Sequence, residues 1–147
     1  MYCILFFRCL ILYYVIDYWS RKTGPKRMWD TLFKKFKRGN RKNISRKRYL
    51  LIVKVVITFF DVVVKKDKCI AQATILAYFL RSCNEVVLKM GCKNANYYRF
   101  QKISTGSPYD TLKQQKGDFH CWVTYNGEPV VQPFYEPFWT TIYMYRV

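Results

Sequence analysis

Histidine and acidic side chains are scarce in this sequence. Its 147 residues include one histidine, His120, and nine aspartates and glutamates against 26 lysines and arginines. No two cysteines have Cys-x-x-Cys spacing, and a second imidazole for a mixed histidine and cysteine zinc site is lacking. A glycine-rich phosphate loop of either standard type is also absent. We therefore expect no metal ion and no other cofactor, which leaves cysteine together with histidine as the available catalytic chemistry.

The six cysteines do not suggest a secreted disulfide scaffold, which would usually be shorter and poorer in core residues. We interpret them as reduced thiols in a cytoplasmic protein. Hydrophobic residues make up 51% of the chain and aromatic residues 19%, which is ample for a packed core and argues against disorder. The length suits one domain, residues 1–147, and no internal repeat or domain break is evident.

Positive charge is what the sequence has in excess, with a formal net charge of +17. Half of the basic residues lie in the span 21–48, where Asp30 is the only acid. Such an excess predicts attraction to an anionic partner: nucleic acid, an acidic peptide or a membrane surface. Trp29, Phe33 and Phe36 are interleaved with these cations, which is compatible with binding of single-stranded nucleic acid. We favour the simpler interpretation, a solvated basic surface on ordinary amphipathic helices.

The first apolar stretch, Tyr2 to Ile16, looks at first sight like a signal peptide or a membrane anchor. It is interrupted by Arg8 and is shorter than the roughly 20 residues needed to span a bilayer. Positive charges follow it rather than precede it, and no small-residue cleavage site is evident. We expect a helix packed on the domain. A peripheral membrane contact is the alternative, because cations beside an apolar helix suit anionic lipid headgroups.

Helices come first along the chain and antiparallel strands follow, which predicts an α+β fold with the helical N-terminal half packed on a C-terminal antiparallel sheet. We expect residues 1–66 to form the helical part and residues 67–147 a last helix and the sheet. Ser45 and Asp67 are placed to cap helices. A buried strand is a weaker alternative for the third helix, which is rich in β-branched residues. The expected helices cover 2–19, 26–37, 45–64 and 68–82, and the expected strands cover 85–93, 96–103, 119–125, 128–134 and 138–147.

Cys69 is the thiol best placed for chemistry. It falls in the first turn of an expected helix, where unpaired backbone N–H groups and the helix dipole favour an anion. Lysines at 65, 66 and 68 add positive potential, and all these effects lower the pKa of a thiol. The competing interpretation is a small core residue, since Cys69 shares a helical stripe with apolar residues. The spacing by itself favours this second interpretation.

His120 opens the expected strand 119–125 and alternates with Trp122 and Thr124 on one of its faces. Its imidazole is the one side chain in the chain with an ordinary pKa near neutrality. A partly buried structural histidine is the ordinary interpretation of such a residue, and the alternation alone favours it.

The two segments taken together resemble a known family. The pattern C-x-x-Q-A-x-x-L-x-x-x-L, a strand ending in glycine, and then F-H-x-W-V-x-x-x-G-x-P-V is similar to the stand-alone B protein, the transglutaminase-like leader peptidase of lasso-peptide biosynthesis. The resemblance covers nearly the whole chain except a loop at about 101–117, and the basic helical N-terminal half fits it. The matching residues are Cys69, Gln72, Ala73, Leu76, Leu80, Leu88, Gly91, His120, Trp122, Val123, Gly127, Pro129 and Val130.

This resemblance implies a papain/transglutaminase-like fold and a cysteine peptidase. Cys69 would attack a peptide carbonyl as a thiolate, and His120 would accept the thiol proton and return it to the leaving amine. The backbone N–H of Cys69 would be one oxyanion donor. Gln72 and Trp122 are candidates for substrate binding. The substrate would be a ribosomally made precursor peptide, with a separate leader-recognition protein as partner and a lasso cyclase acting alongside, and no nucleic acid is expected.

Gln132 stands where this family has the aspartate of its catalytic triad. A glutamine carbonyl can accept the imidazole N–H and fix its tautomer, but it supplies no negative charge to stabilise imidazolium. Glu136 could substitute if the chain bends back. The second hypothesis is therefore a catalytically weakened relative that only binds or scaffolds, and the third is a basic nucleic-acid-binding module.

The Asn126-Gly127 turn decides where Gln132 points, because both common hairpin turns accept this dipeptide. A two-residue turn places Gln132 opposite Cys121, so that it faces away from the imidazole. A three-residue turn with a glycine bulge shifts the pairing by one residue and places Gln132 opposite His120. The triad hypothesis requires the three-residue turn.

Overall fold

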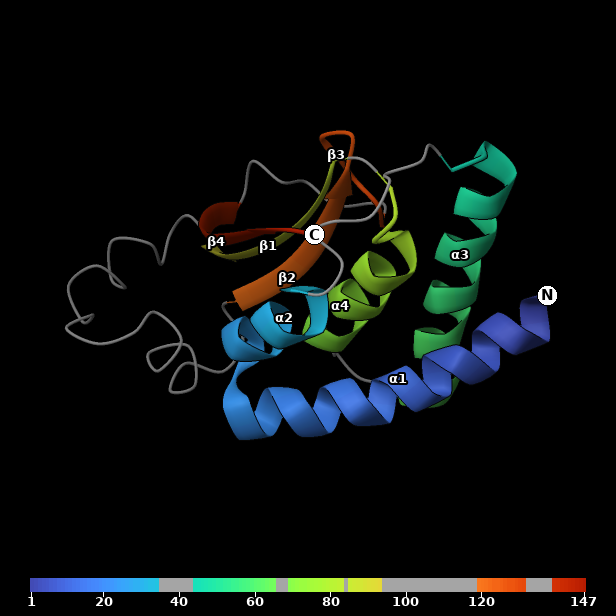
Figure 1. Cartoon of the computed structure of the whole chain (residues 1–147), viewed down its shortest axis with the longest axis horizontal. Helices are drawn as coiled ribbons and strands as arrows, with labels where there is room; N and C mark the ends of the chain where they lie inside the picture. The colour runs from blue at the N-terminus through green and yellow to red at the C-terminus, as the bar shows by residue number, and fades with distance from the viewer. Residues whose placement is uncertain (35–43, 66–68, 84, 94–118, 132–138) are drawn as a thin grey trace, which may run out of the picture.

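Helices fill the first half of the chain and antiparallel strands the second, so the α+β class is confirmed. Figure 1 shows α4 at the centre, between the sheet on one side and α3 on the other, with α1 running along the base. The computed structural model describes residues 1–34, 44–65, 69–83, 85–93, 119–131 and 139–147. Asp67, the expected strand 96–103, Gln132 and Glu136 lie outside the described residues.

The elements follow the expected order. The first three helices are close to their predicted ranges, and strand β3 is shorter than the predicted 128–134. The bounds are α1 (Tyr2–Thr23), α2 (Pro25–Lys34), α3 (Arg46–Phe59), the π-helix η1 (Phe60–Val64), α4 (Cys69–Leu80), β1 (Val86–Lys93), β2 (Phe119–Tyr125), β3 (Glu128–Pro129) and β4 (Trp139–Arg146).

Gly24 separates α1 from α2. Its φ of 82° lies in the region that glycine adopts without a steric penalty, so α1 ends there and the chain turns. Pro25 then begins α2, where its missing N–H removes no intrahelical hydrogen bond. The first helix therefore ends a turn later than the hydrophobic pattern predicts, at Thr23.

The β-branched segment forms α3, so the helical prediction is confirmed and the strand alternative is wrong. Its buried residues, Ile52, Val55, Val56 and Phe59, follow helical spacing and give the helix one face toward the core. The Ser45 side chain accepts a hydrogen bond from the backbone N–H of Arg48 at 3.4 Å, which confirms the predicted cap. Tertiary packing of this face outweighs the mild preference of β-branched residues for strands.

The sheet has the strand order β3-β2-β1-β4 among the described residues, and all its pairings are antiparallel. The helices cover one face of it, which we call the inner face, and α4 packs against both β1 and β2. Inner-face side chains belong to the hydrophobic core, among them Leu88 of β1, Cys121 and Val123 of β2, and Tyr145 of β4. We call the opposite face of the sheet the outer face.

Trp29 of α2 joins a second helix and the sheet. Its side chain is fully buried, and its Nε1 donates a hydrogen bond to Thr74 Oγ1 of α4 at 2.8 Å. The indole ring also stacks on Tyr143 of β4, with ring centroids 5.8 Å apart, and the Lys26 ammonium lies over the same tyrosine ring. The contacts of Trp29 therefore fix α2 against both α4 and β4.

Burial of Cys9 predicts weaker folding at alkaline pH. The side chain is fully buried in α1, and burial raises the pKa of its thiol to about 12. Between the ordinary thiol pKa and that value, the unfolded chain releases a proton that the folded chain keeps, so the free energy of unfolding falls as pH rises. Urea unfolding of wild type and Cys9→Ala between pH 9 and 10.5 measures the effect. We expect the wild type to lose about 2 kcal/mol more over this interval, and identical slopes would contradict the assignment.

Candidate active site

Cys69 is the first residue of α4. Helix starts leave backbone N–H groups without intrahelical acceptors, so the thiol sulfur lies at the positive end of the helix dipole. The side chain is half-buried, which leaves part of it open to a reaction partner. Lys65 ends η1 with a φ of 53°, a left-handed conformation that stops the preceding helix before α4 begins. The described part of α4 agrees with the predicted placement of Cys69 near a helix start, and the predicted cap Asp67 lies outside the described residues.

Cys69 begins the helix that packs on the sheet, and it is close enough to Cys121 of β2 to affect the pKa of that thiol. Burial raises the pKa of Cys121 well above the ordinary range, and the nearby Cys69 thiol raises it further. Two thiols that affect each other in this way are close in space. Cys121 lies between His120 and Trp122 in β2, so the start of α4 lies near the His120 end of this strand.

His120 lies among aromatic rings on the outer face of the sheet. Its ring stacks with that of Trp122, with centroids 6.3 Å apart and 14° between planes, and lies 5.2 Å from the ring of Trp139 in β4. The two indoles are 6.4 Å apart. These three residues form what we call the outer aromatic cluster. The rings restrict the orientations of the imidazole, which is half-buried.

The alternation of β2 gives its two neighbouring candidates different faces. Cys121 belongs to the inner face that α4 covers, whereas His120 belongs to the outer aromatic cluster. Near His120, β2 pairs with β1, while the β3 ladder pairs only with Thr124 and Tyr125. Cys69 lies on the inner, helix-covered side of the sheet near the His120 end of β2. The imidazole lies at the same end of the strand but on the outer face. Their direct pairing as nucleophile and base stays a prediction.

The hairpin has the two-residue turn, so the three-residue turn that the triad hypothesis requires is wrong. Tyr125 pairs with Glu128, and both turn residues have positive φ, 52° at Asn126 and 84° at Gly127. This turn matches the right-handed twist of the flanking strands, and asparagine and glycine tolerate left-handed backbone. The paired part of β3 ends at Pro129, and Gln132 lies outside the described residues, so its predicted role in the triad stays a prediction.

The two candidates for substrate binding differ in accessibility. Gln72 is half-buried in the first turn of α4, one helical turn from the end that carries Cys69. Trp122 is only 5% exposed, so its ring is better suited to packing against the imidazole than to contacting a substrate over a large area. Both roles stay predictions.

Gly91 of β1 makes the outer aromatic cluster possible. It pairs with His120, and a Cβ at this position would lie 2.6 Å from the backbone oxygen of Thr140 and 2.8 Å from the Trp122 ring. Both distances are shorter than van der Waals contact, and the backbone oxygen has no rotamer with which to move away. The glycine therefore lets the Trp122 ring lie flat across β1.

Replacing Gly91 with alanine should destabilise the fold and disturb this cluster. We expect a loss of about 1–3 kcal/mol in the free energy of unfolding, because the added methyl group forces β4 or the Trp122 ring to shift. Urea unfolding gives the stability, and near-ultraviolet circular dichroism reports the tryptophan environment. Lys89→Ala, on the same strand, is the matched control and should change little. Equal stability of Gly91→Ala and wild type would contradict the close approach.

Sequence reasoning missed two parts of the site. Trp139 closes the outer aromatic cluster from β4, and the only signal for it was the aromatic, β-prone tail. Cys121 is close enough to Cys69 for the Cys69 thiol to raise its pKa, and its position in an alternating strand could have indicated a face shared with α4. In the parts of the chain that the structure describes, no three histidine, cysteine or acidic side chains come together as metal ligands. No protein-family model, curated protein or solved structure matches this chain.

Proposed function

We propose that this chain is a cysteine peptidase with a papain/transglutaminase-like fold that removes the leader from a lasso-peptide precursor. One observation carries the proposal: Cys69, at the start of a helix, is close enough to Cys121 of β2 to affect the pKa of its thiol, and Cys121 is the chain neighbour of the only histidine in the sequence, although the two lie on opposite faces of the strand. Two segments 50 residues apart, each carrying one half of the family pattern, thus come together at one end of β2.

The chemistry begins with the Cys69 thiolate. It attacks the carbonyl carbon of the scissile peptide bond, and the backbone N–H groups at the start of α4 stabilise the developing oxyanion. His120 takes the thiol proton and gives it to the leaving amine, which releases one product and leaves the other as a thioester on Cys69. Water, deprotonated by the same imidazole, then hydrolyses the thioester and regenerates the thiol.

A binding-only relative is the second candidate, and the two-residue turn favours it. From the sequence, this is the turn expected to place residue 132 opposite Cys121 rather than His120, and residue 132 itself lies outside the described residues. Glutamine in place of the family's aspartate supplies no negative charge to stabilise imidazolium, which would lower the catalytic power. Such a protein would still bind a precursor through the same surface.

A cleavage assay with a restored aspartate tests the proposal. Wild type and Gln132→Asp are incubated with the precursor peptide and the leader-recognition protein encoded beside it, and the products are identified by mass spectrometry. We expect specific leader removal by wild type. We also expect Gln132→Asp to be at least as active, with a gain of up to roughly 10⁴-fold if the missing charge limits the reaction.

The two candidate functions give different results in this assay. Cleavage by either variant at the leader boundary supports the peptidase. A large loss on Gln132→Asp would mean that Gln132 is not the group that orients the imidazole. Binding of the precursor by both variants without any cleavage would favour the binding-only relative.

A further inference from the structure

Helix α1 is apolar around its whole circumference, yet only one side of it is covered. On the covered side, Cys9 and Ile16 are fully buried, and the rings of Phe6 and Tyr13 make edge-to-face contacts with Phe59 at the end of α3. The helix also contacts α2 and α4. A helix that is hydrophobic all round normally lies in a protein core or in a membrane, and α1 has protein on one side only.

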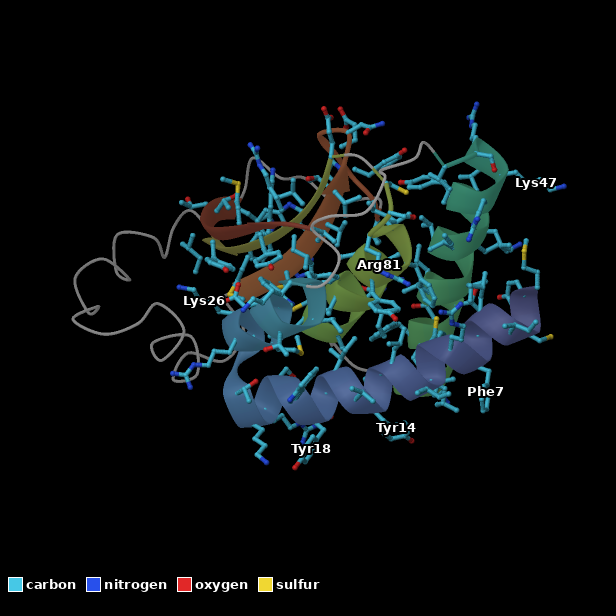
Figure 2. All side chains as sticks on the ribbon, viewed as in Figure 1. Phe7, Tyr14, Tyr18, Lys26, Lys47 and Arg81 are labelled. Atoms are coloured by element: carbon cyan, nitrogen blue, oxygen red, sulfur yellow. The ribbon has the colours of Figure 1, made fainter. Side chains whose placement is uncertain are left out.

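The other side of α1 carries a continuous row of exposed apolar side chains, which we call the α1 stripe. Figure 2 shows three of its members, Phe7, Tyr14 and Tyr18, pointing away from the domain. Their positions repeat every three or four residues, so the stripe covers roughly 100° of the helix, opposite the buried residues. Its members and their exposed fractions are Ile4 65%, Phe7 62%, Ile11 51%, Tyr14 66%, Val15 46% and Tyr18 65%.

The α1 stripe is an apolar surface that exposure to water leaves unfavourable, so it is a candidate for contact with another molecule. Single exposed apolar residues are common on soluble proteins, but contiguous apolar surface marks a site of interaction with protein or lipid. The π-helix η1 contacts the covered side of α1, where the rings of Phe60 and Tyr13 have centroids 5.9 Å apart, and it carries the exposed Val62 and Val63.

Cations border the α1 stripe. Arg8 lies on one flank and Arg21 on the other, and the ammonium of Lys22 lies over the ring of Tyr18 at 5.7 Å. The one acid of this helix, Asp17, forms an ion pair with Arg21 at 2.7 Å, so it adds little free negative charge. Burial lowers the pKa of Arg81, which follows α4, and the positive charge of nearby Arg8 lowers it further. The edge of the apolar surface is therefore positive.

The positive charge at the borders of the α1 stripe argues against a second copy of the chain as the partner. Each copy carries a net charge of +17, so a symmetric pair joined through α1 would bring the same cationic rims together. By length and composition α1 could also cross a bilayer. Its packing along α2, α3 and α4 argues against that, because a helix that spans would have to leave those contacts.

We propose that the α1 stripe docks on the surface of an anionic lipid bilayer, with α1 lying in the plane of the interface. The apolar side chains enter the headgroup and acyl boundary, tyrosine rings suit that depth, and the flanking arginines and lysine meet lipid phosphates. Docking leaves the outer face of the sheet, and with it the outer aromatic cluster, away from the membrane. The inference is independent of the peptidase proposal.

Binding of the full chain to vesicles tests this docking. We expect the chain to co-sediment with vesicles of phosphatidylglycerol and phosphatidylcholine, roughly 5- to 100-fold more tightly than with phosphatidylcholine alone, because each basic residue near the surface contributes about fivefold. High salt should weaken this difference. The double variant Phe7→Ser/Ile11→Ser should bind about 100-fold more weakly, since each side chain moved from water into lipid contributes tenfold or more.

Met144→Ser is the matched control, because Met144 is equally exposed but lies on β4, away from α1. It should bind as wild type does, and the thermal unfolding of all variants shows whether they fold. Absence of binding to anionic vesicles, or equal binding by the stripe variant and wild type, would overturn the proposal. Resistance of the bound chain to extraction with alkaline carbonate would indicate a membrane-spanning helix instead. A soluble dimer that the stripe substitutions dissociate would indicate a second copy of the chain as the partner.

Discussion

Replacing Cys69 with alanine should abolish leader cleavage while the protein stays folded. In cysteine and serine peptidases, removal of the nucleophile costs many orders of magnitude, so under the proposed function we expect a loss of at least roughly 10³-fold in the rate. The effect on folding should be small, because Cys69 is half-buried at the end of a helix and alanine is a good helix former. Mass spectrometry of the precursor after incubation measures the loss.

Cys3→Ala is the matched control for this experiment. Cys3 is an exposed thiol of α1, far along the chain from the candidate site, and its loss should leave cleavage unchanged. His120→Ala should behave like Cys69→Ala, because the thiol then lacks its base. Wild-type cleavage by the Cys69 variant would contradict the assignment of the nucleophile, whatever the fate of the fold.

Replacing Trp29 with alanine should cause the largest loss of stability among the core substitutions considered. The change removes a fully buried indole, leaves a cavity between α2, α4 and β4, and ends the stacking on Tyr143. Truncation of a buried tryptophan costs about 3–5 kcal/mol. Domains of this size are typically stable by only about 5–15 kcal/mol, so the variant should be largely or partly unfolded at moderate temperature.

Urea unfolding followed by far-ultraviolet circular dichroism measures this cost. Two variants calibrate it. Thr74→Val keeps the ring but removes the acceptor of the Trp29 Nε1 hydrogen bond, and we expect a loss of about 1–3 kcal/mol from the buried unsatisfied N–H. Tyr18→Ala removes an exposed aromatic side chain and should change the stability by less than about 0.5 kcal/mol. A Trp29→Ala cost no larger than that of Tyr18→Ala would contradict the anchoring role.

Helices and their order could be predicted because hydrophobic spacing reports local structure directly. The third helix shows how far this extends: its β-branched residues left a strand possible, but the spacing of Ile52, Val55, Val56 and Phe59 indicated one buried helical face. The Ser45 cap could also be predicted, since capping depends on residues three apart in the chain.

The hairpin shows where local rules stop. Asn126-Gly127 predicted the turn but not its length, because the dipeptide suits two turns that differ by one residue. That single residue decides which side chains share a face of the sheet. The choice depends on the twist of the strands and on their packing, and neither can be read from the two turn residues.

Contacts between distant segments were the least predictable part. Trp29 and Thr74 are 45 residues apart, and nothing in the helical spacing of either segment predicts their hydrogen bond. The same holds for the proximity of Cys69 to Cys121 and for the approach of Trp139 to His120. An apolar helix such as α1 gives no periodic signal to show which side the domain covers, so its exposed stripe became visible only with the fold.

The most direct test of the proposed chemistry is the reactivity of the six cysteines toward iodoacetamide, read residue by residue by mass spectrometry between pH 6 and 9. Cys9 and Cys121 should be protected, because both are buried and burial raises the pKa of each thiol. We predict that Cys69 is alkylated first, well below pH 8.5, and that His120→Ala slows its reaction at the lower end of this range. Slow labelling of Cys69 at the same rate as the other thiols, unchanged by His120→Ala, would contradict a thiolate and imidazole pair.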